Sequence, residues 1–121
     1  MRLVGWFQIV AGVAIAGLWS VLLATGEVPE LTEGRLDILF HLGAEFLTAL
    51  LLIAAGTAVV RVGSQVAILL SALAAGSLLY TTINSAGYYA DLGQWPVVAM
   101  FMVLAAVTVM SAVLLIRSVE R

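Results

Sequence analysis

The sequence has no cysteine and very little charge, and each shortage excludes a class of function. Without cysteine there can be no disulfide, no thiolate metal site and no thiol nucleophile. Only 10% of the residues are charged, against about 25% in an ordinary soluble domain. The net charge of −2, with no basic cluster and no phosphate-binding glycine loop, excludes nucleic acid as a partner.

Apolar residues are in excess and make up 64% of the 121 positions. They are collected in four runs, at about 3–24, 36–60, 64–85 and 96–116. Each run is close to the ~20 residues that a spanning helix needs, and in lipid the backbone must satisfy its own hydrogen bonds. We therefore expect an all-α integral membrane protein that forms one domain over 1–121, with the lipid bilayer as its partner.

Short polar connections between the runs predict the topology. They lie at 25–35, 61–65 and 85–96. Because short connections make neighbouring helices antiparallel, the sequence predicts an up-down-up-down bundle of four transmembrane helices. Pro96 suits the first turn of the last helix, where its missing N–H is harmless.

Charge asymmetry predicts the orientation in the membrane. One end of such a bundle carries Arg2, Arg61, Arg117 and Arg121 with Glu120. The other end carries Glu27, Glu30, Glu33, Asp37 and Asp91 with Arg35. By the positive-inside rule, both termini are expected on the cytoplasmic side of a cell (inner) membrane.

Two polar stripes interrupt the apolar helices. Asp37, His41 and Glu45 are spaced i, i+4 and i+8, so they share one helix face. Tyr80 and Asn84 are also i, i+4, and counting from the outer ends puts them at the depths of Glu45 and His41. The matched depths predict one polar pocket open toward the outside, with the first and last helices as walls. Its expected ligand- or proton-binding residues are His41, Glu45, Tyr80, Asn84, Asp37, Tyr88 and Trp95.

The alternative is a hydrogen-bonded network that only sets helix register. A carboxylate in a spanning helix costs about 2.5–3.5 kcal/mol even on the lenient insertion scale, so Glu45 should face the bundle interior and have a partner. Interhelical hydrogen bonds contribute only about 0.6 kcal/mol on average, which favours a functional role for the pair. Gln8, near the predicted cytoplasmic surface, is expected to be merely interfacial.

A histidine beside a glutamate can hold or pass a proton, or bind a cation by losing one, because histidine changes charge near neutral pH. His41 and Glu45 are too few ligands for a structural zinc site within one chain. In a homo-oligomer with His41 facing the symmetry axis, a metal or a bis-histidine haem could lie between protomers. No motif in the sequence implies a particular cofactor.

The segments "HLGAEF" and "YTTINSAGYYADLGQWPVVAMF" resemble small four-helix prokaryotic membrane proteins without an assigned activity. The resemblance covers the last three spans. The positions that carry it are His41, Glu45, Tyr80, Asn84, Tyr88, Tyr89, Trp95 and Pro96. It supports the four-helix architecture and implies no activity.

Two better-known groups share part of this pattern. Small multidrug resistance transporters are similar in length and helix number, but they carry a carboxylate in the first helix, and here that helix has no acid. The sterol isomerase and sigma-2 receptor superfamily has membrane-embedded His and Glu spaced as in His41 to Glu45. That similarity spans one helical turn, and it would make the pair a proton donor and acceptor for a lipid-like substrate held against Tyr80 and Trp95.

Three hypotheses follow from the sequence. The first is a binding or transport protein whose pocket takes a small ligand or cation, coupled to protonation of His41 and Glu45. The second is a membrane enzyme with acid–base chemistry on a lipid-like substrate, against which stands the absence of a recognisable nucleophile, oxyanion device or cofactor motif. The third is a structural subunit of a larger membrane complex. We favour the first.

Overall fold

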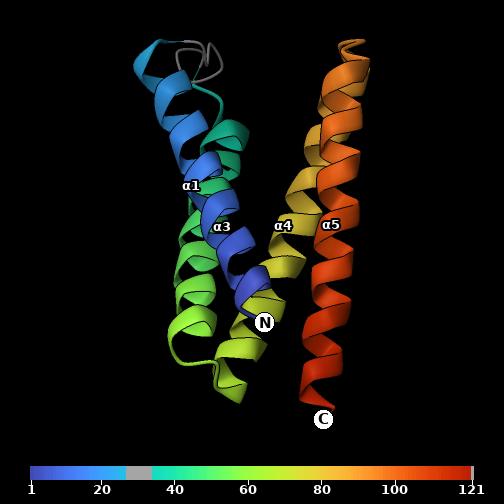
Figure 1. Ribbon diagram of the computed structural model, residues 1–121. Helices are drawn as coiled ribbons and strands as arrows, with labels where there is room; N and C mark the ends of the chain where they lie inside the picture. The colour runs from blue at the N-terminus through green and yellow to red at the C-terminus, as the bar shows by residue number, and fades with distance from the viewer. Residues whose placement is uncertain (27–33, 121) are drawn as a thin grey trace.

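The computed structural model describes residues 1–26 and 34–120, and within these ranges the chain forms four helices and no β-strand. The helices are α1 (Arg2–Ala24), α3 (Leu36–Arg61), α4 (Gln65–Asp91) and α5 (Trp95–Val119). All four are long and apolar enough to cross a membrane. They run alternately up and down, so that both chain ends lie at one end of the bundle (Figure 1).

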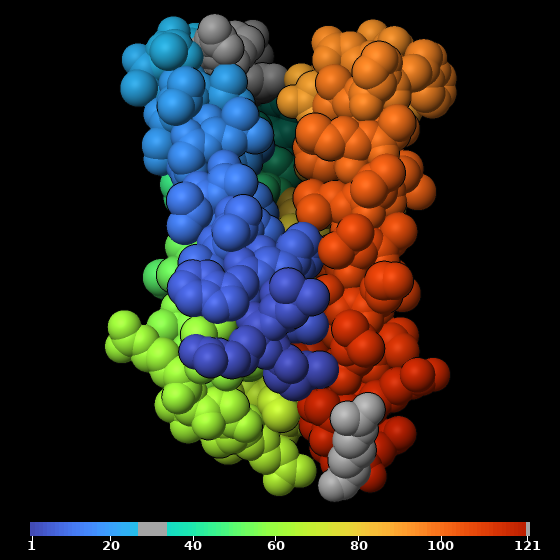
Figure 2. All heavy atoms as spheres, in the orientation of Figure 1, coloured from blue at the N-terminus to red at the C-terminus, as the bar shows by residue number. Residues whose placement is uncertain are grey.

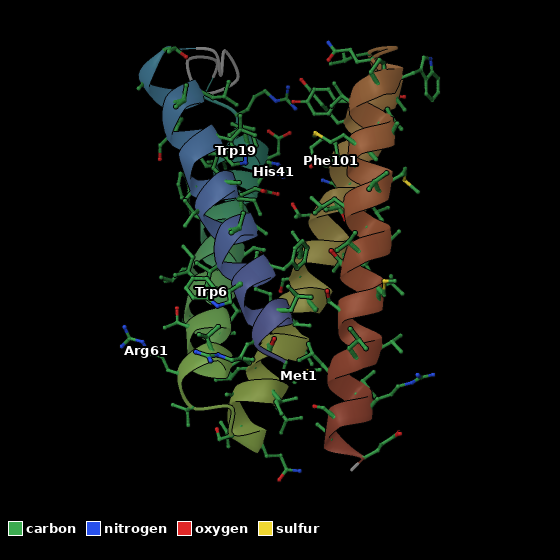
Figure 3. All side chains as sticks on the ribbon, in the orientation of Figure 1. Met1, Trp6, Trp19, His41, Arg61 and Phe101 are labelled. Atoms are coloured by element: carbon green, nitrogen blue, oxygen red, sulfur yellow. The ribbon has the colours of Figure 1, made fainter. Side chains whose placement is uncertain are left out.

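The charged groups used to predict orientation are only partly described. Arg61 lies at the same end of the bundle as Met1 (Figure 3), as the alternating topology requires. The acids Glu27, Glu30 and Glu33 and the terminal Arg121 lie outside the described residues.

The ends of α4 show how local sequence sets helix length. The Ser64 hydroxyl accepts a hydrogen bond from the Ala67 N–H at 3.2 Å and so caps the first turn. The helix then continues past the expected end at 85, because a tertiary contact stabilises the additional turns. The ring of Tyr89 stacks on Phe101 of α5, with centroids 5.7 Å apart. The helix ends at Asp91, and Gly93, with φ +72°, turns the chain into α5.

α1 packs along α3 through small residues. A Cβ added to Gly56 would lie 2.5 Å from the backbone oxygen of Gly5, and one added to Gly12 would lie 2.7 Å from the oxygen of Ala49. Glycine is therefore required at these crossings, as expected for close helix packing in lipid. Gly17 has no such neighbour within 4 Å, so close packing does not require a glycine there.

The buried apolar centre lies where α1, α3 and α4 meet. Its members are Ala11, Leu52, Ala55, Ala74 and Leu78. α5 packs along α4, with at most marginal contact to the other helices. Figure 2 shows the consequence in the half of the molecule away from the chain ends: α1 and α5 stand apart, and atoms of α3 and α4 lie at the bottom of the hollow between them. The helices therefore form an open bundle of two hairpins, joined along α3 and α4.

Gln8 occupies a different place from the one expected. Its side chain is 1% exposed, so the prediction of an interfacial position is wrong. Its Nε2 donates to the Ser71 backbone oxygen at 2.9 Å, and the Ser71 hydroxyl donates back to Gln8 Oε1 at 2.6 Å. This reciprocal pair joins α1 to α4, and its position on the inner face of α1 could not be deduced from depth alone.

Candidate functional site: a His–Glu pair beside a pocket between α3 and α4

Glu45 is the buried acid of the structure, with 6% of its surface exposed. Its carboxylate accepts hydrogen bonds from two other helices. The Thr81 hydroxyl of α4 donates to Oε1, and the Trp19 indole N–H of α1 donates to Oε2 at 3.3 Å. A carboxylate has about four acceptor positions, so these two donors hold Glu45 in place and leave capacity for a further donor.

His41 lies one helical turn from Glu45, nearer to the end of the bundle. Its Nε2 is 3.9 Å from Glu45 Oε1, and its side chain is 32% exposed. The Trp19 ring meets the imidazole edge-on, with centroids 5.7 Å apart and planes at 75°. Figure 3 shows Trp19 and His41 side by side, at the opposite end of the molecule from Met1 and Arg61. Trp19 thus contacts both members of the pair.

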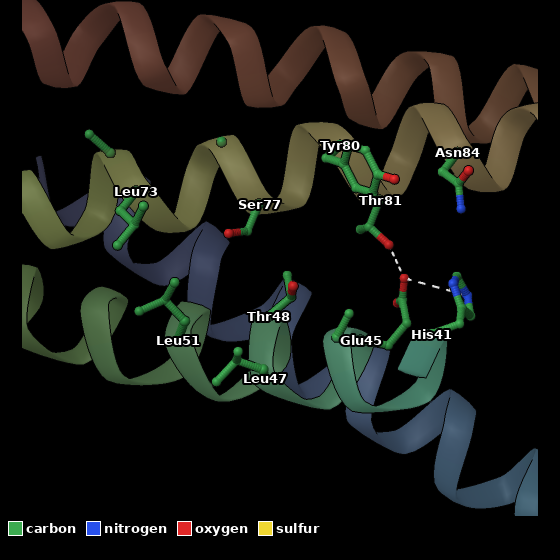
Figure 4. A pocket seen from close by; sticks show the side chains of 13 residues that line it. His41, Glu45, Leu47, Thr48, Leu51, Leu73, Ser77, Tyr80, Thr81 and Asn84 are labelled. Carbon is green, nitrogen blue, oxygen red and sulfur yellow. Dashed lines mark hydrogen bonds and ion pairs between the residues drawn. The ribbon is translucent and has the colours of Figure 1, made fainter. Parts of the chain in front are cut away.

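The pair borders a pocket of about 620 Å³ between α3 and α4. The pocket residues from α3 are His41, Ala44, Glu45, Leu47, Thr48 and Leu51, and those from α4 are Ala72, Leu73, Gly76, Ser77, Tyr80, Thr81 and Asn84. Figure 4 shows the polar side chains of the two helices facing each other along this seam. Leucines occupy the part that lies farther from His41.

The structure places four of the seven expected site residues on this pocket: His41, Glu45, Tyr80 and Asn84. The two polar stripes therefore do face each other. Tyr80 is 74% exposed and lies at the mouth of the pocket, whereas the residue that reaches Glu45 is its neighbour Thr81. Whether these residues bind a ligand stays a prediction.

The other three expected residues lie outside the pocket. Asp37 is exposed at the start of α3 and forms an ion pair with Arg35, two residues away, at 2.5 Å. Tyr88 packs edge-on against Tyr89, with centroids 5.2 Å apart. Trp95 is 64% exposed at the first residue of α5. The positions of these three residues are those of side chains at the polar end of the bundle, not of side chains in a buried site.

The expected walls also differ. The lining residues all belong to α3 and α4, so the first and last helices do not enclose the pocket, although Trp19 of α1 contacts its acid. Helix α5 packs along α4 and contributes no residue to the lining of the pocket. The pocket therefore lies between α3 and α4 alone and is not enclosed by the two expected walls.

Thr81 and Trp19 are the partners of Glu45 that sequence reasoning missed. A signal for Thr81 was present: Ser77, Thr81 and Asn84 are spaced i, i+4 and i+7 and so share a face of α4. The predicted stripe included Tyr80, the residue immediately before Thr81, in place of Thr81 itself. Trp19 belongs to the first helix, which was expected only as a wall of the pocket, and its indole reaches Glu45 through a contact that the crossing of α1 and α3 creates.

Several polar groups on the pocket wall are uncommitted. Within residues 1–26 and 34–120, the side chains of Thr48, Ser77 and Asn84 have no hydrogen-bond partner. By contrast, Thr57 donates to the Ile53 backbone oxygen at 2.6 Å, as helical threonines commonly do. The pocket thus offers free donors and acceptors next to a carboxylate.

Within residues 1–26 and 34–120, no group of three His, Asp or Glu residues lies close enough together to hold a metal ion. These residues therefore give no support for a metal site within one chain. A metal or haem shared between protomers, with His41 or Glu45 as ligands, stays a prediction.

The model of one protein family, described as "Domain of unknown function (DUF8058)", matches residues 1–121. The chain belongs to this family. The match covers all four helices, in agreement with the resemblance to small four-helix proteins without an assigned activity. No curated protein and no solved structure matches the DUF8058 chain. The argument for its function therefore rests on the geometry of the pocket.

Proposed function

We propose that the pocket between α3 and α4 binds a small ligand or a cation, and that binding is coupled to protonation of the His41–Glu45 pair. The observation that supports this proposal is an ionisable acid, 6% exposed, that lies 3.9 Å from a histidine and borders a pocket of about 620 Å³. Burying such an acid costs about 2.5–3.5 kcal/mol or more, whereas one interhelical hydrogen bond recovers about 0.6 kcal/mol. A purely structural role would not need an ionisable group.

The proposal places the protein in the cell (inner) membrane as a multi-pass protein with cytoplasmic termini. This orientation follows from the arginines at the end that holds both termini and the Arg61 turn. The proposal extends to movement of the ligand across the membrane. It also extends to a symmetric homo-oligomer, in which a second copy would close the open flank of the pocket.

Native mass spectrometry of protein extracted gently from its own membrane tests the binding step. The variant Glu45→Gln/His41→Ala removes both side chains of the pair, while Glu120→Gln removes one exposed carboxylate at the C-terminal end of α5, far from the pocket. We expect a small molecule or ion to be retained by the wild type and by Glu120→Gln, and lost from the double variant. Occupancy in the wild type should also change with pH, because the proposal couples binding to protonation of the pair.

A weakly held ligand requires a second measurement. Vesicles containing the protein and a trapped pH-sensitive dye report proton flux when a potassium, sodium or magnesium gradient is applied. The proposal expects flux in the wild type and in Glu120→Gln that is lost in Glu45→Gln/His41→Ala. Equal retained masses together with equal flux in all three proteins would overturn it.

A further inference from the structure

The pocket between α3 and α4 is long for its volume. Its lining runs over 41–51 of α3 and 72–84 of α4, which at 1.5 Å per residue is about 15–18 Å. Its volume of about 620 Å³ falls within the roughly 300–1,000 Å³ of ordinary small-molecule sites. A narrow cavity of this length fits an extended molecule better than a compact one.

The chemical character of the lining changes along this length. His41, Glu45 and Asn84 lie at one end, while Leu51 and Leu73 lie at the other (Figure 4). A molecule that matches both ends has a polar head and an apolar chain. A hydrated metal ion or a uniformly polar solute would leave the leucine end without a partner.

The head of such a molecule would meet hydrogen-bonding groups that the protein does not use itself. Thr48, Ser77 and Asn84 line the pocket without a partner among the described residues. Thr48 and Ser77 are partly exposed and Asn84 is exposed, so all three are accessible to a ligand. A ligand head that donates and accepts hydrogen bonds would satisfy these groups.

Charge restricts the head further. Glu45 is the acid on the pocket wall, and the one base beside it among the described residues, His41, is already paired with Glu45 at 3.9 Å. No arginine of 1–26 or 34–120 lines the pocket, and the sequence contains no lysine. Phosphate and carboxylate heads are normally bound by arginine, lysine or clustered backbone N–H groups. An anionic head would instead approach Glu45, so an uncharged or cationic head is favoured.

The pocket also opens where an apolar chain could enter from the bilayer. Leu47, Leu73 and Tyr80 line it and are 66%, 60% and 74% exposed. These residues lie on the flank of helices that are apolar enough to span a membrane, and not at a polar end.

We propose that the pocket takes a single-chain amphiphile with an uncharged or cationic, hydrogen-bonding head, such as a long-chain alcohol or amine. This inference rests on the function proposed above and specifies its ligand. The head lies against Glu45 and hydrogen-bonds to Asn84, Ser77 and Thr48, and the chain lies along Leu51 and Leu73.

Photolabelling of the full chain in phosphatidylcholine vesicles tests this ligand class. Three probes are compared: a sixteen-carbon alcohol, the matching amine and the matching carboxylic acid, each with a photoreactive group near the middle of the chain. Labelled peptides are mapped by mass spectrometry, and labelling of the exposed α5 residues Val103 and Val107 serves as the reference for ordinary lipid contact. We expect the alcohol and the amine to label the 41–51 and 72–84 segments about tenfold more than the acid does, relative to this reference.

A matched pair of variants assigns the labelling to the free hydroxyls. Thr48→Val/Ser77→Ala removes two uncommitted hydroxyls from the pocket. Thr57→Val/Ser118→Ala removes two hydroxyls that donate to backbone oxygens elsewhere. The first variant should lower pocket labelling about fivefold and the second should leave it unchanged, with equal α5 labelling showing that both proteins are folded.

Several outcomes would overturn the inference. Equal pocket labelling by the acid would contradict the head-group selection, and labelling of the pocket no stronger than that of α5 would indicate ordinary lipid contact. An unlabelled pocket in a protein that native mass spectrometry shows as a dimer would mean that a second copy covers this flank. In each of these cases, a proton flux that still depends on Glu45 would leave the proposed function standing and remove only the ligand class.

Discussion

Within residues 1–26 and 34–120, side chains make two buried polar contacts between helices, and the two differ in chemistry. Gln8 and Ser71, which join α1 to α4, are 1% and 0% exposed and exchange two hydrogen bonds. Glu45, which is linked to Trp19 and Thr81, is ionisable and borders a pocket with free hydrogen-bonding groups. The first contact is neutral and complete, whereas the second is charged or protonated according to pH and has room for another partner.

In this mostly apolar chain, the Gln8–Ser71 contact serves helix packing, whereas the contacts of Glu45 suit ligand binding. A neutral pair that satisfies itself stabilises one arrangement of helices and offers a ligand nothing. An acid with spare acceptor capacity beside a pocket is costly for packing and suited to binding. We therefore expect substitutions near Gln8 to change stability, and substitutions near Glu45 to change ligand binding.

The largest expected effect comes from the close crossing of α1 and α3 near Gln8. In Gly56→Leu, the new Cβ would lie 2.5 Å from the Gly5 oxygen and 3.2 Å from Gln8 Cβ. Because backbone must move to accommodate it, the free energy of unfolding should fall by about 3 kcal/mol. Unfolding in mixed detergent micelles, followed by circular dichroism, measures this change. Gly43→Leu, at a position with nothing within 4 Å, is the control, and an equal loss there would show that the crossing is not tight.

A smaller effect is expected from the neutral pair itself. Gln8→Leu leaves the Ser71 hydroxyl buried without its acceptor and should cost about 1–2 kcal/mol of unfolding free energy. Adding Ser71→Ala removes the orphaned group and should restore part of that loss, while binding in the α3–α4 pocket stays unchanged. The same unfolding assay measures both proteins. A double variant no more stable than Gln8→Leu would show that the two side chains are not coupled.

The smallest expected effect concerns the indole that contacts the His–Glu pair. Trp19→Phe keeps an aromatic ring near His41 but removes the N–H that donates to Glu45 Oε2. We expect less than about 1 kcal/mol of lost stability and a loss of about fivefold in labelling by the long-chain amine. Trp6→Phe, at an exposed position on the same helix, is the control. If Trp19→Phe lowers stability but leaves labelling unchanged, Trp19 contributes to helix packing and not to ligand binding.

Sequence reasoning succeeded where one helix could be treated alone. The four helices long enough to span a membrane were predictable because length and apolar composition decide them. The facing polar stripes were predictable because residues four apart share a helix face. It failed where two helices decide the outcome. Gln8 was expected at an interface and is buried, and α4 continues beyond its predicted end to the turns where Tyr89 stacks on Phe101.

The sequence by itself determined that this chain is helical, that it has four segments able to span a membrane, and that His41 and Glu45 share one face of the second. Only the tertiary structure decided that Thr81 and Trp19 hold the carboxylate, and that α5 takes no part in the pocket. Helical periodicity relates residues within one helix, but the rotation and crossing of each helix depend on close contacts between helices. In this protein the Gly5–Gly56 crossing is one such contact.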